Sequence, residues 1–138
     1  MKTVKTAAIA CLAIPVLFGA GPVLAASLES LQGAWLVSGQ DCAATFEKKG
    51  GAIRFKDAAS SLATGIIIAG DRITGPNGVC SVKRVRDDGG RLSLHMGCAD
   101  AVLASSMSVS LKIVDADTFE LTDPLFPDET QNYQRCKL

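Results

Sequence analysis

The sequence of 138 residues is poor in the features that nucleic-acid-binding proteins and membrane proteins need. It has one histidine, seven aromatic residues (one Trp, one Tyr and five Phe), and 14 basic residues against 14 acidic ones. Balanced charge argues against nucleic acid and against an anionic membrane surface, because both attract basic proteins. Beyond the N-terminal segment, no apolar run reaches the ~18 residues that a transmembrane helix needs. We therefore expect no nucleic-acid partner, no membrane span and a mainly aliphatic core.

The N-terminal segment has the three parts of a secretory signal peptide. Two lysines precede an apolar run over residues 7–20, and Ala25 ends a small-residue cleavage pattern. Cleavage after Ala25 or Ala26 leaves one domain, residues 26–138. We therefore predict an exported protein, periplasmic or secreted.

The cysteines indicate a disulfide framework. Cys11 falls inside the predicted signal peptide, which leaves Cys42, Cys80, Cys98 and Cys136. An even number of cysteines in a small exported domain is typical of structural disulfides, and four cysteines allow three pairings. No Cys-x-x-Cys redox motif and no metal-ligand spacing of Cys or His occurs, so we expect neither a metal nor a cofactor.

Residues 78–98 favour one of the three pairings. Cys80 and Cys98 are equally distant from Asp88-Gly89-Gly90, which predicts a hairpin with a three-residue loop. A regular register that places Cys80 opposite Cys98 gathers apolar side chains on one face. This register pairs Val82 with Met96, Arg84 with Leu94 and Arg86 with Leu92 on one face, and Lys83 with His95, Val85 with Ser93 and Asp87 with Arg91 on the other. It favours a Cys80–Cys98 bridge and leaves Cys42 for Cys136; the other two pairings stay open.

The remaining pattern predicts an all-β domain. Short alternating segments indicate strands, and a Gly70-Asp71 turn sets Ile68 opposite Ile73. The expected strands cover residues 33–38, 52–56, 65–69, 72–74, 106–113, 118–121 and 132–136, besides the hairpin. Asp41 is a candidate N-cap for one short helix over residues 42–49, ended by Gly50-Gly51. We expect an antiparallel meander closed as a barrel of roughly eight strands, with a β-sandwich as the alternative.

No catalytic constellation is evident. A Ser-His-Asp system needs His95, whose neighbours Ser93 and Asp100 are ordinary strand residues, and the sequence contains no Gly-x-Ser-x-Gly elbow. The acidic pairs lie in predicted turns, without the apolar surroundings that raise a carboxyl pKa. We therefore predict that the protein is not an enzyme.

The segment LQGAW, residues 31–35, places Gly33 and Trp35 at the opening of the first strand. This LxGxW opening resembles the start of small lipocalin-like (calycin) β-barrels, including bacterial periplasmic protease-inhibitor barrels. The resemblance implies that Trp35 plugs one end of an eight-stranded barrel and that a basic residue of the last strand, here Arg135, packs across it. The Thr-Asp-Tyr-type segment of that family is absent. A large core residue is the alternative interpretation of Trp35.

Three hypotheses for function follow. The first is a non-enzymatic barrel that binds a small apolar ligand, because the expected inward side chains are aliphatic and no catalytic constellation is evident. The second is a periplasmic inhibitor (of a protease or a lysozyme) or another protein-partner module, in which Leu125, Phe126 and a free segment over residues 27–31 contact the partner. The alternative for Phe126 is burial in a loop that covers a barrel end. The third is a structural envelope protein. The binding candidates are Trp35, Leu125 and Phe126.

Overall fold

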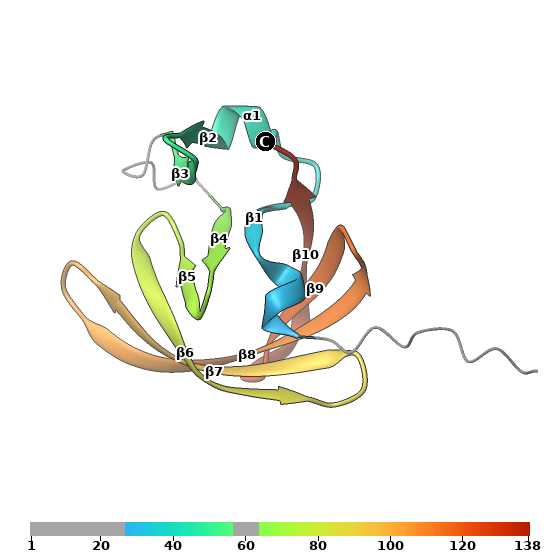
Figure 1. The fold of residues 1–138 in the computed structure, drawn as a ribbon. Helices are drawn as coiled ribbons and strands as arrows, with labels where there is room; N and C mark the ends of the chain where they lie inside the picture. The colour runs from blue at the N-terminus through green and yellow to red at the C-terminus, as the bar shows by residue number, and fades with distance from the viewer. Residues whose placement is uncertain (1–26, 57–63) are drawn as a thin grey trace, which may run out of the picture.

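The computed structural model describes residues 27–56 and 64–138, so the predicted signal peptide, with Cys11 and both cleavage sites, lies outside the described residues. Eight antiparallel strands close into a barrel in the order β1-β10-β9-β8-β7-β6-β5-β4 (Figure 1). The strands are β1 (Gly33–Val37), β4 (Ile66–Ala69), β5 (Arg72–Thr74), β6 (Gly78–Asp87), β7 (Arg91–Asp100), β8 (Ala104–Asp115), β9 (Thr118–Asp123) and β10 (Phe126–Cys136). The predicted all-β barrel is confirmed, and the sandwich alternative is not the fold that forms.

Closure of the barrel depends on β1, which pairs on one side with β10 and on the other with β4. Because a closed sheet has no free edge, this pairing satisfies the backbone groups that an open meander would expose. The neighbouring β4–β5 hairpin sets Ile68 opposite Ile73, as predicted from its Gly70-Asp71 turn.

The β6–β7 hairpin confirms part of the predicted register. Cys80 lies opposite Cys98 and Val82 opposite Met96, and residues 88–90 form the three-residue loop. The register then shifts by one at a β-bulge over Lys83, so the predicted pairs beyond this point are wrong. The pairs that form are Arg84 with His95, Val85 with Leu94, Arg86 with Ser93 and Asp87 with Leu92.

The bulge has a reason in the composition of β6. Between Lys83 and Asp87 only Val85 is apolar, so the inner face gains little from a strict alternation there and the register is weakly specified. An inserted residue raises the local twist, which helps a long hairpin to curve around a barrel. On β7 the buried residues Leu92, Leu94 and Met96 still share the inner face.

The predicted helix is shorter than expected. The α-helix α1 covers Cys42–Thr45, and the Asp41 side chain accepts a hydrogen bond of 2.8 Å from the Ala43 N–H, which confirms the cap. The second half of the predicted helix is strand β2 (Phe46–Lys49), which pairs with β3 (Ala52–Phe55). Gly50 and Gly51 both have positive φ and form the turn between these strands.

Burial of two phenylalanines explains this correction. Phe46 and Phe55 face each other across the β2–β3 pair and pack on Leu36, on the outer side of β1. A continued helix would place only Phe46 there. The hairpin therefore builds a second small core outside the barrel, which contains Ala34, Leu36, Phe46, Phe55 and Cys136.

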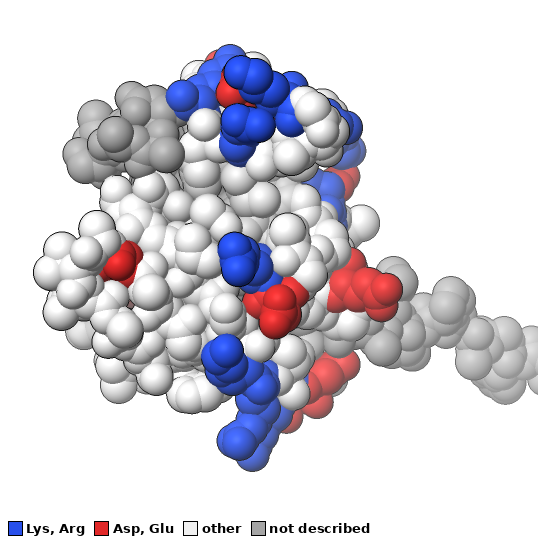
Figure 2. Space-filling view, turned by 60° about the vertical axis from the view of Figure 1, so that its left-hand side comes forward, with Lys and Arg blue, Asp and Glu red and all other residues white. Residues whose placement is uncertain are grey.

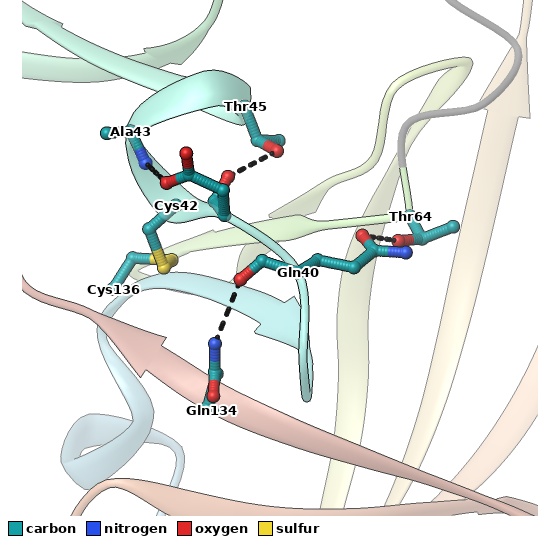
Figure 3. Close-up of a disulfide and its surroundings, with 8 residues drawn as sticks. Gln40, Cys42, Ala43, Thr45, Thr64, Gln134 and Cys136 are labelled. Atoms are coloured by element: carbon teal, nitrogen blue, oxygen red, sulfur yellow. Dashed lines mark hydrogen bonds between the residues drawn. A yellow bond between two sulfur atoms is a disulfide. The ribbon is translucent and has the colours of Figure 1, made fainter.

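Both disulfides form as predicted. Cys80–Cys98 crosses the β6–β7 hairpin, and Cys42–Cys136 joins α1 to the end of β10 (Figure 3). Figure 3 also shows the Gln134 amide donating to the Gln40 carbonyl oxygen beside this bridge. The chain between β1 and β4 is thereby fixed to the barrel wall near its starting point.

Candidate ligand cavity

The barrel contains an apolar cavity with a volume of about 390 Å³, which is partly open to solvent. Its lining comes from β4 to β10 and from the β5–β6 turn. The lining residues are Ile66, Ile68, Ile73, Gly75, Pro76, Asn77, Gly78, Cys80, Leu94, Met96, Met107, Val109, Leu111, Leu121 and Tyr133. The inward positions of an eight-stranded barrel thus leave room for a small molecule instead of filling the interior completely.

The wall of the cavity carries no charged side chain. Aliphatic residues and two methionines form most of it, and only Asn77 and Tyr133 have polar side chains. The Tyr133 hydroxyl donates to Gln131 Oε1 at 3.3 Å, and burial raises the pKa of Tyr133 above its ordinary value. Tyr133 is therefore neutral at physiological pH, and the wall can contact an apolar molecule over almost its whole surface.

One end of the barrel is closed by the 3-10 helix η1 (Leu28–Leu31), which lies beside β1 in Figure 1. The Trp35 indole N–H donates to the Leu31 carbonyl oxygen at 2.7 Å, and both side chains are buried. The Gln32 side chain exchanges two hydrogen bonds with the Gly70 backbone in the β4–β5 turn. Residues 27–31 are therefore docked, and the expectation of a free segment there is wrong.

Arg135 completes this closed end. Its guanidinium lies over the Trp35 ring, so the expected contact between these two residues forms, and it donates to the carbonyl oxygens of Ser30 and Gln32 at 2.7 and 2.6 Å. It also donates to the Ala116 carbonyl oxygen at 3.0 Å. Trp35 is fully buried and stands outside the cavity lining. Of the three binding candidates, it therefore belongs to the closed end and has no direct contact with the cavity.

The β5–β6 turn lies at the opposite end of the barrel, because β5 runs away from the Gly70-Asp71 turn that η1 covers. Residues 75–78 of this turn line the cavity together with Met107, which is 40% exposed. This end therefore provides the opening of the cavity to solvent.

Two hairpin tips expose large apolar residues. The β9–β10 turn presents Leu125 and Phe126, which are 82% and 58% exposed, so the alternative in which Phe126 is buried at a barrel end is wrong. Sequence reasoning missed Val102 and Leu103, exposed at the β7–β8 turn. At both tips an aspartate caps backbone N–H groups: Asp123 accepts from Leu125, and Asp100 accepts from Val102 and Leu103. These hydrogen bonds lower the pKa of Asp100, that from Leu103 most.

Of the residues considered for catalysis, Ser93 and His95 line one hollow on the outer surface, and Asp100 lines another. His95 is exposed on the outer face of β7, where its Nδ1 lies 3.1 Å from Ser108 Oγ. Within residues 27–56 and 64–138 no group of three His, Cys, Asp or Glu side chains could hold a metal ion. In the same part of the chain no helix is long and apolar enough to cross a membrane.

Basic residues gather away from the cavity. Figure 2 shows Lys and Arg at the top of the molecule, where Figure 1 places β2 and β3. The exposed basic residues of this region are Lys48, Lys49, Arg54 and Lys56. Below this region the left-hand part of the surface is mostly uncharged, and further Lys, Arg, Asp and Glu side chains lie toward the centre and the lower edge (Figure 2).

The cavity is the site that sequence reasoning located least well. Tyr133, Met96 and Met107 line the cavity but were not binding candidates. The alternation along β7 and β8 did predict which side chains of these two strands point into the barrel. The signal that could have found Tyr133 is that the only tyrosine lies two residues before Arg135 on the same strand face. Comparison of the chain with protein-family models, with curated proteins and with solved structures finds no match.

Proposed function

We propose that the protein is an exported, non-enzymatic binding protein that holds a small apolar molecule inside its barrel. The observation that carries this proposal is the cavity of about 390 Å³ with its almost wholly apolar wall. This volume lies within the ~300–1,000 Å³ that ligand pockets usually have. The two disulfides support export, because such bonds persist in oxidising compartments.

The energetics favour an apolar occupant. A hollow lined by side chains such as Leu94, Val109 and Leu121 lacks the contacts that a close-packed core would provide. Water gains little there, because it needs two to four polar partners and the wall offers only Asn77 and Tyr133. Each methylene group that moves from water into this cavity contributes about 0.8 kcal/mol.

The experiment compares two valine substitutions on β8. Val109 lines the cavity, and Val114 is exposed on the same strand. We expect the oxidised protein to enhance the fluorescence of N-phenyl-1-naphthylamine, and Val109→Phe to reduce this binding because the larger ring occupies the cavity. Val114→Phe should bind the dye as the unmodified protein does.

Native mass spectrometry of the protein, purified from a host that exports it, extends this test. A bound small molecule that is lost from Val109→Phe but kept by Val114→Phe supports the proposal. Absence of any bound mass, together with no dye binding by the unmodified protein, would contradict it.

A second candidate function is that of a protein-partner module, for which exposure of Leu125 and Phe126 is the specific observation. Large apolar residues at a capped hairpin tip are suited to anchoring a partner protein. The test measures inhibition of a secreted metalloprotease and of a lysozyme by the protein. Inhibition that Phe126→Ser abolishes, while Val114→Ser leaves it intact, would favour this function; no inhibition of either enzyme would contradict the inhibitor form of it.

A further inference from the structure

We infer that the cavity selects a neutral molecule with one hydroxyl group, and that the Tyr133 hydroxyl is the hydrogen-bond partner of that group. The inference rests on the proposed function and names the class of ligand. It excludes the carboxylates of the same chain length, such as fatty acids at neutral pH.

Rejection of an anion follows from the wall. A carboxylate that enters an apolar cavity loses its hydration and needs a cation or several N–H donors in exchange. The side chains that line this cavity provide no cation, and their only polar groups belong to Asn77 and Tyr133.

None of the basic residues of the described chain lines the cavity, and Arg84 and Arg86 of β6 are exposed to solvent. Arg135 donates to three backbone carbonyl oxygens at the closed end. Lys48, Lys49, Arg54 and Lys56 belong to the region of β2 and β3, which packs on the outside of β1. No charge from these residues reaches the interior of the barrel.

Selection of a hydroxyl group follows from Tyr133. Its ring stacks on Phe119 with centroids 5.1 Å apart, so its place in the wall is fixed. Its O–H donates to Gln131 Oε1 at 3.3 Å, which leaves the lone pairs of the phenolic oxygen free to accept. An alcohol can donate into this position, whereas an ether of the same shape cannot.

The first experiment measures charge selection with two dyes that share one ring system. N-phenyl-1-naphthylamine is neutral, and 1-anilinonaphthalene-8-sulfonate adds one sulfonate. Displacement of the neutral dye by 1-decanol or by decanoate at pH 8 repeats the comparison of a neutral with an anionic ligand for a linear alkyl chain. We expect each anion to bind at least about tenfold more weakly than its neutral counterpart, because its charge stays unpaired in the cavity.

A substitution at the opening provides the gain of function. Met107 lines the cavity and is partly exposed, so Met107→Arg can extend its charged group to water without loss of the fold. We expect Met107→Arg to raise the affinity for decanoate relative to that for decanol, because its cation pairs with the carboxylate. Met107→Gln is the neutral control and should not raise the affinity for decanoate relative to that for decanol.

The second experiment measures hydroxyl selection. We expect the protein to bind 1-decanol about fivefold more tightly than 1-methoxynonane, a difference of one hydrogen bond. Tyr133→Phe keeps the ring and its stacking, and should bind both compounds equally.

The outcomes are separable. Equal binding of neutral and anionic ligands would overturn the charge selection while the binding function stands. Equal binding of decanol and methoxynonane by the unmodified protein would overturn the role of Tyr133. Binding of none of these compounds would overturn the proposed function itself, and with it this inference.

Discussion

The guanidinium carbon of Arg135 lies 4.2 Å from the centre of the Trp35 ring. Trp35 belongs to the first strand of the barrel and Arg135 to the last. The two residues lie directly opposite each other in the β1–β10 register. The pair thus joins the two ends of the sheet at the closed end of the barrel. The Arg135 guanidinium also donates to the carbonyl oxygens of Ser30 and Gln32, which holds η1 over this end of the barrel.

Replacement of Arg135 by lysine should destabilise the fold although the charge is kept. A lysine cannot reproduce the planar set of N–H groups that reaches Ser30, Gln32 and Ala116 at once. We expect the free energy of unfolding to fall by about 2 kcal/mol, from lost hydrogen bonds and weaker stacking. Urea denaturation measures this, with Arg91→Lys on the exposed surface as the control. Equal effects of the two substitutions would contradict the role of Arg135.

The two disulfides should differ in what they contribute. Cys42–Cys136 spans 94 residues of sequence and Cys80–Cys98 spans 18. Chain-entropy arithmetic gives about 4.7 kcal/mol for a loop near 100 residues and about 3 kcal/mol for one near 15. We expect Cys42→Ser with Cys136→Ser to lower the denaturation midpoint more than Cys80→Ser with Cys98→Ser. A non-reducing peptide map of each variant identifies the remaining bond, and the reverse order of midpoints would contradict the prediction.

Gly65 should tolerate no larger residue, although its backbone angles are ordinary. A Cβ atom there would lie 2.5 Å from Phe46 Cζ and 3.1 Å from the Trp35 carbonyl oxygen. We expect Gly65→Ala to cost about 1–3 kcal/mol, because the contact between the β2–β3 hairpin and β1 must open. Gly75→Ala is the matched control, since its Cβ would meet no atom closer than 3.8 Å. Thermal unfolding of both variants tests this, and equal melting temperatures would contradict it.

Asp117 should give the fold part of its sensitivity to acid. A hydrogen bond from Lys137 at 2.8 Å lowers the pKa of Asp117 below its ordinary value of 3.8, and the charges of Lys137 and Arg135 act in the same direction. A pKa lowered by folding means that the ionised carboxylate stabilises the native state. This contribution is complete above the unfolded pKa and disappears as the pH falls through the lower, folded value.

The Asp117→Asn variant tests this, because asparagine does not titrate. We expect the variant to be less stable than the unmodified protein at pH 7, and the two melting temperatures to converge below pH 3.8. Two curves that stay parallel across this range would show that Asp117 contributes nothing through its charge.

The sequence alone predicted those parts of the fold where alternation and a tight turn agree. Ile68 and Ile73 face each other because the glycine turn and the apolar pattern require one register. The same agreement predicted the Cys80–Cys98 pair. It failed beyond Lys83, where the strand has too few apolar residues to prefer one register over the next.

Other parts depend on distant partners. Phe46 fits a helical face as well as a strand, and only Phe55 with Leu36 decides between them. The cavity could not be predicted, because whether inward side chains fill a barrel depends on its diameter and tilt rather than on alternation. Leu125 and Phe126 are exposed, as the partner hypothesis requires, and their role in binding stays a prediction; their exposure accompanies the Asp123 cap and the hairpin tip that they occupy.

The short strands β4 and β5 determine where the barrel opens locally most easily. Each of their ladders (β1–β4, β4–β5 and β5–β6) holds three residue pairs, whereas β6–β7 and β7–β8 hold nine each. Segments with few backbone hydrogen bonds open locally at the lowest free energy. Ile66, Ile68 and Ile73 of these strands also line the cavity. The side of the barrel that opens most readily therefore coincides with one wall of the cavity, so local opening there would expose the cavity to solvent from the side.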